Sequence, residues 1–290
     1  MSILPKTYAE HTENYKWNIT KDSYNKRVRV DDFYGDAREV IKAAIQKTEE
    51  WQCEKLIIKA RNEDLSAFIE KGFNLEAMVD KYFSGNTMYF MCMYLTAERR
   101  KSDTWAEDDR TLARILEKTA EKKEPKPPIP SHLQLKKCGS EDSGRLAQLY
   151  DAVFTVYPVP MNDEGYVRKS IESGNVFFAY FDGEKAISAV CGEINKHYSN
   201  AEITDCATLP EYRQYGLIQS LLGELENELA SQHIFCLYSI ARSRSFGMNA
   251  AFYRLQYKYR GRLANNCIIS EGLEDMNVWV KLLKSQKSGD

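Results

Sequence analysis

The chain has 290 residues, of which 43% are hydrophobic and 12% aromatic, so it is long enough for one large domain or two of ordinary size. Its formal net charge of −2 argues against general nucleic-acid binding, which usually requires a basic surface. No run approaches the roughly 18 apolar residues that span a bilayer, and residues 1–8 lack the apolar core of a signal peptide. We therefore expect a cytoplasmic protein without a nucleic-acid or membrane partner.

The cysteines are odd in number and lack the paired spacing of a disulfide framework or a zinc site. We expect them to be reduced and mostly buried. None of the four histidines has a ligand-like neighbour, so the sequence predicts no metal. The seven cysteines are Cys53, Cys92, Cys138, Cys191, Cys206, Cys236 and Cys267.

The first part of the chain has the pattern of an α/β region. Residues 1–25 are polar and rich in tyrosine and show no clear period. Periodicity then predicts helices at 35–52 and 62–72 and strands at 26–30, 55–59, 73–83 and 87–95. Gly72 follows the second helix at a position that suits a left-handed cap. The charged residues 99–124 are expected to form an exposed helix.

Prolines separate this region from the rest of the chain. Residues 125–130 contain four prolines in six positions, which favours a stiff, extended spacer. We therefore expect an N-terminal α/β domain at 1–124, a linker at 125–131 and a second domain at 132–290.

The second domain has a strand-rich α/β pattern that lacks the regular alternation of a Rossmann fold. Helices are expected at 141–155, 163–173, 217–229 and 246–255, and strands at 133–137, 176–181, 185–194, 201–208, 235–240, 258–264 and 275–283.

The most informative stretch joins the expected strand at 201–208 to the helix that follows it. Pro210 has no backbone N–H and stops the sheet ladder. The run Arg213-Gln-Tyr-Gly216 then forms a turn, in which Gly216 can adopt backbone angles that other residues avoid. Unpaired N–H groups of residues 214–218 would converge at the positive end of the helix dipole, where Arg213 adds a charged hydrogen bond. The pattern predicts a pyrophosphate site; the alternative is a helix start with one incidental glycine.

This stretch resembles a known signature. Arg213-x-x-Gly216-x-Ile218 is similar to the Arg/Gln-x-x-Gly-x-Gly/Ala motif of the GNAT N-acetyltransferase superfamily, which binds the pyrophosphate of acetyl-CoA. Ile218 replaces the usual Gly or Ala, so the helix is expected to meet the phosphates slightly differently. Residues 201–207 match the strand that pairs with the pantetheine arm in that superfamily.

Three further motifs, at 241–249, 257–266 and 273–281, are similar to β-lysine N-acetyltransferases. The resemblance covers most of the chain. It implies the α/β fold of GNAT acyl-CoA N-acetyltransferases, which is a mixed, mostly antiparallel sheet flanked by helices.

The resemblance also implies acetyl-CoA as co-substrate. Backbone groups of Cys206 and Thr208 would bind the amides of the pantetheine arm and polarise the acetyl carbonyl. Asn249 would hydrogen-bond that arm or the start of its own helix. The full set of expected coenzyme-binding residues is Cys206, Ala207, Thr208, Arg213, Gln214, Tyr215, Gly216, Leu217, Ile218 and Asn249.

Acetyl transfer requires a neutral amine, so a base is needed. Glu202 lies 11 residues before Arg213, where many members of the superfamily have a glutamate that acts through water. Glu193 and Asp205 are rival bases. Alternatively, Glu202 only binds backbone or solvent at a strand end.

The leaving thiolate needs a proton donor. Tyr253 stands in the helix where many of these enzymes carry such a tyrosine. Tyr257 and Tyr259 are alternatives, and Tyr253 could also be an ordinary core aromatic.

The expected partner is a small-molecule amine, and a homodimer is one expected assembly. The resemblance implies acetylation of the N6 amine of β-lysine, which gives the compatible solute N6-acetyl-β-lysine and serves salt tolerance. There are two alternatives. The enzyme could acetylate another polyamine, amino acid or protein lysine, or the protein could be a non-catalytic acyl-CoA sensor. Expected substrate-binding residues are Glu193, Asp205, Arg242, Tyr157, Asn265 and Asn266.

The N-terminal domain has a weaker resemblance of its own. Residues 67–73 align loosely with 251–257, and the order strand, helix, glycine, strand, strand matches the second half of an acetyltransferase domain. No phosphate-binding turn precedes it. We interpret the region as a degenerate, non-catalytic half-repeat that shapes or covers the active site; an unrelated α/β cap is the alternative.

Overall fold

The computed structural model describes residues 4–118, 127–154, 159–269 and 272–283. These residues form two compact units, which we describe separately. Unit 1 consists of Met1–Thr111, Arg242–Arg244 and Tyr259–Val278. Unit 2 consists of Leu112–Ala241, Ser245–Lys258 and Trp279–Asp290. These units differ from the expected domains, because the contacts group residues 259–278 with the N-terminal part of the chain. The expected domain boundaries at 124 and 131 stay a prediction.

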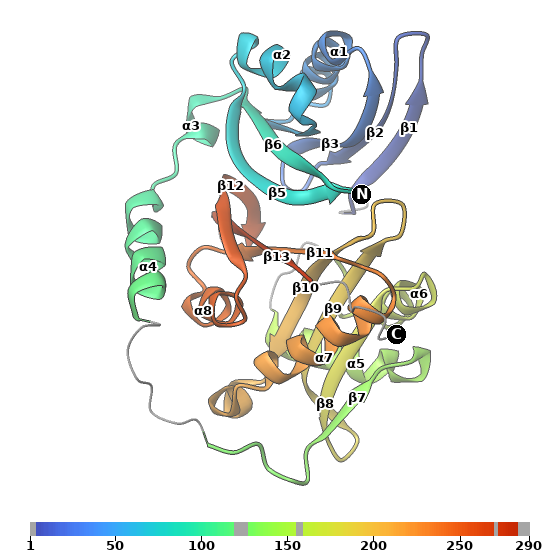
Figure 1. Ribbon diagram of the computed structural model, residues 1–290, viewed down its shortest axis with the longest axis vertical. Helices are drawn as coiled ribbons and strands as arrows, with labels where there is room; N and C mark the ends of the chain where they lie inside the picture. Colours follow the sequence, from blue (N-terminus) through green and yellow to red (C-terminus); the bar gives the residue numbers. More distant parts are fainter. Residues whose placement is uncertain (1–3, 119–126, 155–158, 270–271, 284–290) are drawn as a thin grey trace, which may run out of the picture. The chain divides into compact units, whose positions relative to one another are not determined.

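Unit 1 contains a sheet whose strands follow the order β1-β2-β3-β4-β6-β5-β12-β13 (Figure 1). Helix α1 packs on β2, β3 and β4 and against α2. The elements are β1 (Lys6–His11), β2 (Tyr15–Asp22), β3 (Arg27–Gly35), α1 (Ala37–Glu50), β4 (Lys55–Ala60), α2 (Leu65–Glu70), β5 (Asn74–Phe83), β6 (Asn86–Tyr94), α3 (Ala97–Arg100), the start of α4 (Trp105–Lys118), β12 (Lys258–Ile269) and β13 (Gly272–Leu282).

Local chemistry explains the position of α1. The Asp36 carboxylate accepts hydrogen bonds from the backbone N–H groups of Arg38 and Glu39 and so caps the first turn. Val40, Ile41 and Ala44 lie on one face of the helix at helical spacing and are fully buried. This face closes the hydrophobic core of unit 1 over the sheet.

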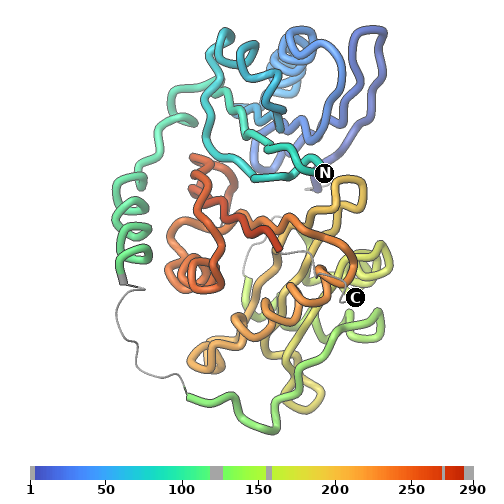
Figure 2. The backbone as a smooth tube through the Cα atoms, viewed as in Figure 1, coloured from blue at the N-terminus to red at the C-terminus, as the bar shows by residue number. Residues whose placement is uncertain are grey.

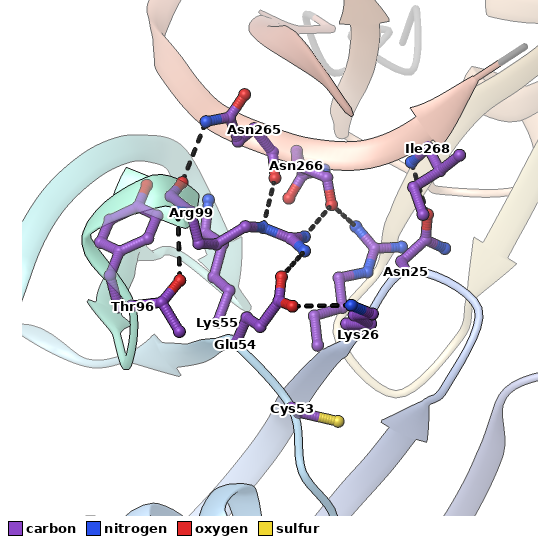
Figure 3. Close-up of polar contacts among 12 residues, drawn as sticks. Asn25, Lys26, Cys53, Glu54, Lys55, Thr96, Arg99, Asn265, Asn266 and Ile268 are labelled. Carbon is purple, nitrogen blue, oxygen red and sulfur yellow. Dashed lines mark hydrogen bonds and ion pairs between the residues drawn. The ribbon is translucent and has the colours of Figure 1, made fainter. Parts of the chain in front are cut away.

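Buried cations hold β12 against the N-terminal part of unit 1. Lys55 Nζ, Arg99 Nε and Arg27 Nη1 donate to the successive carbonyl oxygens of residues 264–266, at 2.7, 3.0 and 3.0 Å. Figure 3 shows Arg99 between this strand and the carboxylate of Glu54. These side chains form their bonds across long sequence separations, which is why residues 259–278 belong to unit 1.

Unit 2 contains the strand order β7-β8-β9-β10-β11. Its elements are β7 (Gln134–Lys137), α5 (Ser143–Val153), α6 (Glu164–Glu172), β8 (Val176–Asp182), β9 (Lys185–Asn195), β10 (Asn200–Thr208), a 3-10 helix (Pro210–Tyr215), α7 (Leu217–Ser231), β11 (Cys236–Arg242) and α8 (Phe246–Arg254).

Helices cover both faces of this sheet. Residues 176–181 of β8 are all buried, and consecutive strand residues point to opposite faces, so neither face is open to solvent there. Helix α7 lies on one face, where a Cβ on Gly192 would come within 3.2 Å of Leu225 and 3.3 Å of Leu229. Helix α5 packs on β9 and β10 and against α6.

The same order of elements occurs twice along the chain, as the trace in Figure 2 allows the reader to follow. The series β1-β2-β3-α1-β4-α2-β5-β6 recurs as β8-β9-β10-α7-β11-α8-β12-β13. In both series the third strand runs antiparallel to the second and parallel to the fourth. Both third strands contain a bulge, at Asp31 in β3 and at residues 205–206 in β10. The N-terminal region thus repeats this order of elements and these strand orientations, and its interpretation as a degenerate acetyltransferase-like domain stays a prediction.

Most of the expected elements are present, with two differences. Residues 1–25, which show no period, contain β1 and β2. The expected helix at 99–124 is α3 followed by α4, and its last expected residues, 119–124, lie outside the described residues. Six of the seven cysteines are buried and all are free thiols, which confirms their expected state.

Candidate active site

Strands β10 and β11 run together briefly and then separate. The parallel pairing joins residues 200–202 to residues 236–238, while β10 continues to Thr208 and β11 to Arg242. The bulge in β10 follows the last pair, and Asp205 there has a φ of 50°. In the described chain, backbone groups of Cys206 and Ala207 therefore lie outside the ladder to β11. An extended ligand with amide groups can pair with β10 at this place.

The turn after β10 leads into a helix whose N-terminus has no side-chain cap. Gly216 adopts the left-handed conformation, with φ of 66° and ψ of 32°, as the sequence predicts. Helix α7 begins at Leu217, and among the described residues neither a capping side chain nor an acidic residue of the first turn occupies its start. The N–H groups there can bind an anion. Gly216 N itself donates to the Arg213 carbonyl (3.3 Å), because residues 210–215 form a 3-10 helix rather than an open turn.

Hydrogen bonds fix the end of β10 and this turn to each other. The hydroxyls of Ser188 and Thr208 lie 2.7 Å apart, and Ser188 also donates to the Ala207 carbonyl at 3.1 Å. Arg213 Nε donates to the Thr208 carbonyl at 3.2 Å. Tyr212 Oη donates to Asp182 at 2.7 Å and ties the 3-10 helix to the β8–β9 hairpin. These contacts leave the Arg213 side chain exposed next to the uncapped helix.

The remaining expected coenzyme residues surround the same turn. Gln214 is exposed, Tyr215 and Ile218 are half-buried, and Leu217 is buried under the start of α7. The structure thus brings together all expected coenzyme residues of β10, the turn and the start of α7.

Three carboxylates gather on the β9–β10 surface. Glu202 is the cross-strand partner of Glu193, and Thr204 is the partner of Cys191, so these side chains share one face of the sheet. Burial raises the pKa of the Cys191 thiol, and Asp205, Glu193 and Glu202 raise it further. The carboxylates of all three residues therefore lie within electrostatic range of this thiol, and the structure brings the three candidate bases together.

Tyr166 completes this cluster and was not among the residues expected from the sequence. Burial raises the pKa of its phenol to about 12, with further contributions from Glu193 and Asp205. The side chain of Tyr166 comes from α6, which follows residues 155–158. On the sequence it is one tyrosine of 18, on a helix with ordinary amphipathic spacing, and no local signal marks it.

Helix α8 presents Tyr253, the expected proton donor. Its ring packs edge-on against Trp279 (6.3 Å between centroids), and its hydroxyl donates to the Leu116 carbonyl at a long 3.4 Å. Asn249 is fully buried: its Nδ2 donates to the Ser245 carbonyl (2.8 Å) and its Oδ1 accepts from Trp279 Nε1 (2.7 Å). Of the two roles expected for Asn249, the structure shows the bond to the helix start.

Of the two alternative donors, Tyr257 is less accessible than Tyr253, whereas Tyr259 is half-buried like Tyr253. Tyr257 is 1% exposed, and burial together with the nearby Glu226 carboxylate raises the pKa of its phenol well above the usual value. Tyr259 belongs to unit 1. Burial therefore favours Tyr253 over Tyr257, and the assignment of the proton donor stays a prediction.

Three expected substrate residues also belong to unit 1, where the side chains of Arg242 and Asn265 form hydrogen bonds and Asn266 is buried. Arg242 binds Glu274 through two hydrogen bonds, Nε to Oε2 at 2.7 Å and Nη2 to Oε1 at 2.6 Å. Asn265 donates to the carbonyls of Arg99 and Lys101, and Asn266 is 5% exposed. Their roles toward a substrate stay predictions. Tyr157 lies outside the described residues.

The N-terminal copy of the β10–β11 separation is closed by side chains. Beyond the paired residues of β3 and β4, Lys59 Nζ binds Asp31 (3.1 Å), and Arg61 donates to the Phe33 carbonyl (2.7 Å) and to Asp32 (2.9 Å). Strands β4 and β11 occupy the same place in the two series. Lys59 lies four residues after the first paired residue of β4, and the residue four positions after the first paired residue of β11 is the uncharged Ile240.

The N-terminus of α1, the helix that follows β3, is also unsuited to binding an anion. The Asp36 carboxylate occupies the N-terminus of α1, and Glu39 adds a second negative charge to its first turn. Of the two copies, as far as their residues are described, the one in unit 2 combines an open strand edge with an uncapped helix, and the N-terminal one does not.

The described part of the chain has no group of three or more His, Cys, Asp or Glu side chains placed to hold a metal ion. The expected absence of a metal stays a prediction. Among the helices of the described residues, none has both the length and the apolar character needed to cross a bilayer.

Comparison with known proteins places this site in a family. Residues 145–255, from α5 through α8, match the acetyltransferase (GNAT) family. N-acetyltransferase YodP of Bacillus subtilis is 36% identical to the chain over 265 residues, which cover 91% of this chain and 95% of that protein. Beta-lysine N(6)-acetyltransferase of Methanosarcina mazei is 30% identical, over 73% of this chain and 85% of that protein. The enzyme of the same name from Methanococcus maripaludis is 30% identical, over 89% of this chain and 93% of that protein.

The matched segment contains the open strand edge, the left-handed glycine, the uncapped helix α7 and Tyr253. Two of the relatives align over 91% and 89% of this chain, and the third over 73%. The protein therefore belongs to the GNAT family of acetyl-CoA-dependent N-acetyltransferases and has the fold of that family.

Proposed function

We propose that the enzyme transfers the acetyl group of acetyl-CoA to the N6 amine of β-lysine. The observation that carries the proposal is the cluster of Glu193, Glu202 and Asp205 beside the separation of β10 and β11. A substrate with two ammonium groups is attracted by several carboxylates, whereas a mono-amine needs fewer. Two relatives at 30% identity are named beta-lysine N(6)-acetyltransferases, and a third, at 36%, has a name that specifies no amine.

Residues of the chain fit the coenzyme. The N–H groups at the start of α7 and the Arg213 guanidinium would bind the pyrophosphate, and backbone groups of Cys206 and Ala207 would pair with the pantetheine amides. In the proposed complex, the thioester would lie beside the acidic cluster.

The chain supplies a base for the first proton transfer. Glu202, directly or through one water, accepts a proton from the N6 ammonium, and Glu193 and Asp205 hold the second ammonium group. The neutral nitrogen then attacks the thioester carbonyl carbon in a ternary complex. The C–N bond forms and the C–S bond breaks, and the electron pair leaves with sulfur.

Tyr253 would donate its hydroxyl proton to the leaving thiolate, and the second proton, which the nitrogen loses as the amide forms, would return through solvent to the Tyr253 oxygen. The product keeps one ammonium group and one carboxylate and is therefore a neutral zwitterion. A small neutral solute of this kind suits a role as a compatible solute in salt tolerance. The cytoplasm as the place of the reaction, and a homodimer, stay predictions.

A thiol-release assay with β-lysine, α-lysine, spermidine and a lysine peptide tests the substrate. We expect the highest kcat/KM with β-lysine. Glu193→Gln should raise the KM for β-lysine about tenfold, because a charge-assisted contact to an ammonium is lost, and leave the KM for acetyl-CoA within about twofold. Glu172→Gln, which removes an exposed charge of the same sign from α6, is the matched control and should change neither.

Other outcomes would contradict the proposal in distinct ways. Preference for spermidine or for the peptide would assign the enzyme to another amine. Tight coenzyme binding without turnover on any amine of the panel would point to an acyl-CoA sensor.

A further inference from the structure

Helix α4 begins in unit 1, and its last part belongs to the same unit as Tyr253. The contacts assign residues up to Thr111 to unit 1 and residues from Leu112 onward to unit 2, which also contains α8. We call residues 112–118 the end of α4. This segment precedes the proline-rich stretch in the sequence, so it lies outside the second domain that the sequence predicts at 132–290.

Two apolar side chains anchor the end of α4. Ile115 is 1% exposed and Leu112 is 9% exposed. They lie three positions apart and therefore share one face of the helix, whereas Arg114 and Glu117 are exposed. Because the contacts of this segment group it with unit 2, the buried face holds the end of α4 on that unit.

Two further contacts join the end of α4 to α8. The Arg114 guanidinium lies over the Phe246 ring, 5.6 Å from its centroid, and the Tyr253 hydroxyl donates to the Leu116 carbonyl at 3.4 Å. Phe246 and Tyr253 are seven positions apart, which places them about two turns apart on one face of α8. Leu116 belongs to the last turn of α4, where helix carbonyls generally accept from groups outside the helix. The end of α4 thus contacts the face of α8 that carries Tyr253.

Different elements support the two ends of the Tyr253 side chain. Its ring packs edge-on against Trp279, which is fully buried and donates to Asn249 Oδ1 at 2.7 Å. In the described chain, the hydrogen-bond partner of the hydroxyl is the Leu116 carbonyl. A general acid must lie within hydrogen-bond reach of its acceptor, and a displacement of about 1 Å can lower a rate about 100-fold. The support of the hydroxyl therefore bears on the rate of acetyl transfer.

We propose that the end of α4 is a positioning element for acetyl transfer and that Ile115 is its anchor. The proposal rests on the proposed role of Tyr253 as proton donor. The buried Ile115 side chain keeps the segment on α8, and the segment keeps the Tyr253 hydroxyl in place. When the thiolate forms, the hydroxyl turns from the Leu116 carbonyl to the charged sulfur, which is the stronger acceptor. Ile115 acts through Tyr253 and needs no contact with the coenzyme or the amine.

A double-mutant cycle in the full chain tests the proposal. Thiol release is measured with whichever amine of the panel turns over fastest. Ile115→Ala should lower kcat about tenfold and leave the KM for acetyl-CoA within about twofold, because the hydroxyl is displaced while the coenzyme turn is unchanged. Ile115→Val keeps a β-branched apolar side chain and should retain kcat within about twofold. In the Tyr253→Phe background, Ile115→Ala should cause no further loss of kcat, because the hydroxyl is already absent.

Ile234→Ala is the matched control for a general loss of packing. Ile234 is 3% exposed, belongs to the same unit and directly precedes β11, whereas α8 follows the other end of that strand. A strand of this length spans about 20 Å. The variant should therefore keep kcat within about twofold. Circular dichroism at the assay temperature checks that each variant is folded.

Arg114→Gln is a milder test that leaves the buried face of α4 intact. It removes the contact of an exposed guanidinium with the Phe246 ring and should lower kcat about two- to fivefold without changing the KM for acetyl-CoA. This loss should also vanish in the Tyr253→Phe background. Arg110→Gln, which removes an exposed arginine one turn earlier on α4, should have no effect. The cycle with Arg114→Gln decides the question if Ile115→Ala does not fold.

Four results would overturn the proposal. Unchanged kcat in folded Ile115→Ala would remove the positioning role. An equal loss of kcat with and without the Tyr253 hydroxyl would show that α4 acts by another route. An equal loss in Ile234→Ala would reduce the effect to general destabilisation. Full activity of Tyr253→Phe would remove the proton donor and this proposal together, and the choice of amine substrate would still stand.

Discussion

Replacement of Tyr253 by phenylalanine should lower kcat for acetyl transfer by about 10²- to 10⁴-fold, the usual contribution of a positioned general acid. The phenol is half-buried on α8, and its single described hydrogen bond, to the Leu116 carbonyl, is long at 3.4 Å. This hydroxyl can therefore turn to another acceptor. Phenylalanine keeps the ring contact with Trp279, so the fold of α8 should persist. Steady-state kinetics should show the KM for acetyl-CoA unchanged within about twofold.

Tyr257→Phe is the matched control for this prediction. Its hydroxyl is buried near Glu226 and Lys281, away from solvent. The variant should keep kcat within a few-fold. A large fall in kcat with Tyr257→Phe and none with Tyr253→Phe would reverse the assignment of the proton donor.

Lys55→Met should lower the free energy of unfolding by about 3–5 kcal/mol, the range found when one partner of a buried ion pair is removed. The Lys55 side chain is 0% exposed, and its ammonium binds both Glu76 (2.8 Å) and the Ala264 carbonyl (2.7 Å). Methionine fills a similar volume but leaves the buried Glu76 carboxylate without its cation. Urea unfolding monitored by circular dichroism measures the loss.

Two further variants serve as controls for the Lys55→Met prediction. Lys26→Met removes an ion pair to Glu54 in which the Lys26 side chain is 59% exposed, and it should cost about 0–1 kcal/mol. The double variant Lys55→Met/Glu76→Gln should recover part of the loss, because the unpaired charge is then gone. A cost below about 1 kcal/mol for Lys55→Met alone would contradict the account of how β12 is held.

Local chemistry made the coenzyme turn predictable from the sequence. The left-handed conformation of Gly216 and the helix after it follow from residue types a few positions apart. Strands β8 and β9 were predictable for a similar reason, because nearly continuous apolar runs are typical of strands buried on both faces. By contrast, β1 is almost entirely exposed and has no apolar alternation to detect.

Other features depend on contacts across long sequence separations. The bonds of Lys55, Arg99 and Arg27 to residues 264–266 join parts of the chain more than 160 positions apart, so the grouping of β12 with unit 1 left no local signal. The bonds of Arg61 to Phe33 and Asp32, which close the N-terminal copy, could likewise be predicted only if the neighbouring strands were already known. Tyr166 joins the acidic cluster through the packing of α6, which helical periodicity alone does not place.

Calorimetric titration with acetyl-CoA tests the central claim most directly, namely that one of two topologically equivalent copies binds the coenzyme. We expect one coenzyme per chain. Gly216→Val should weaken binding by at least about tenfold, because a β-branched residue is disfavoured at a φ of 66° and its side chain would obstruct the phosphates. Arg61→Gln in the N-terminal copy should leave the stoichiometry at one. Two coenzymes per wild-type chain, or binding that survives Gly216→Val unchanged, would contradict the account.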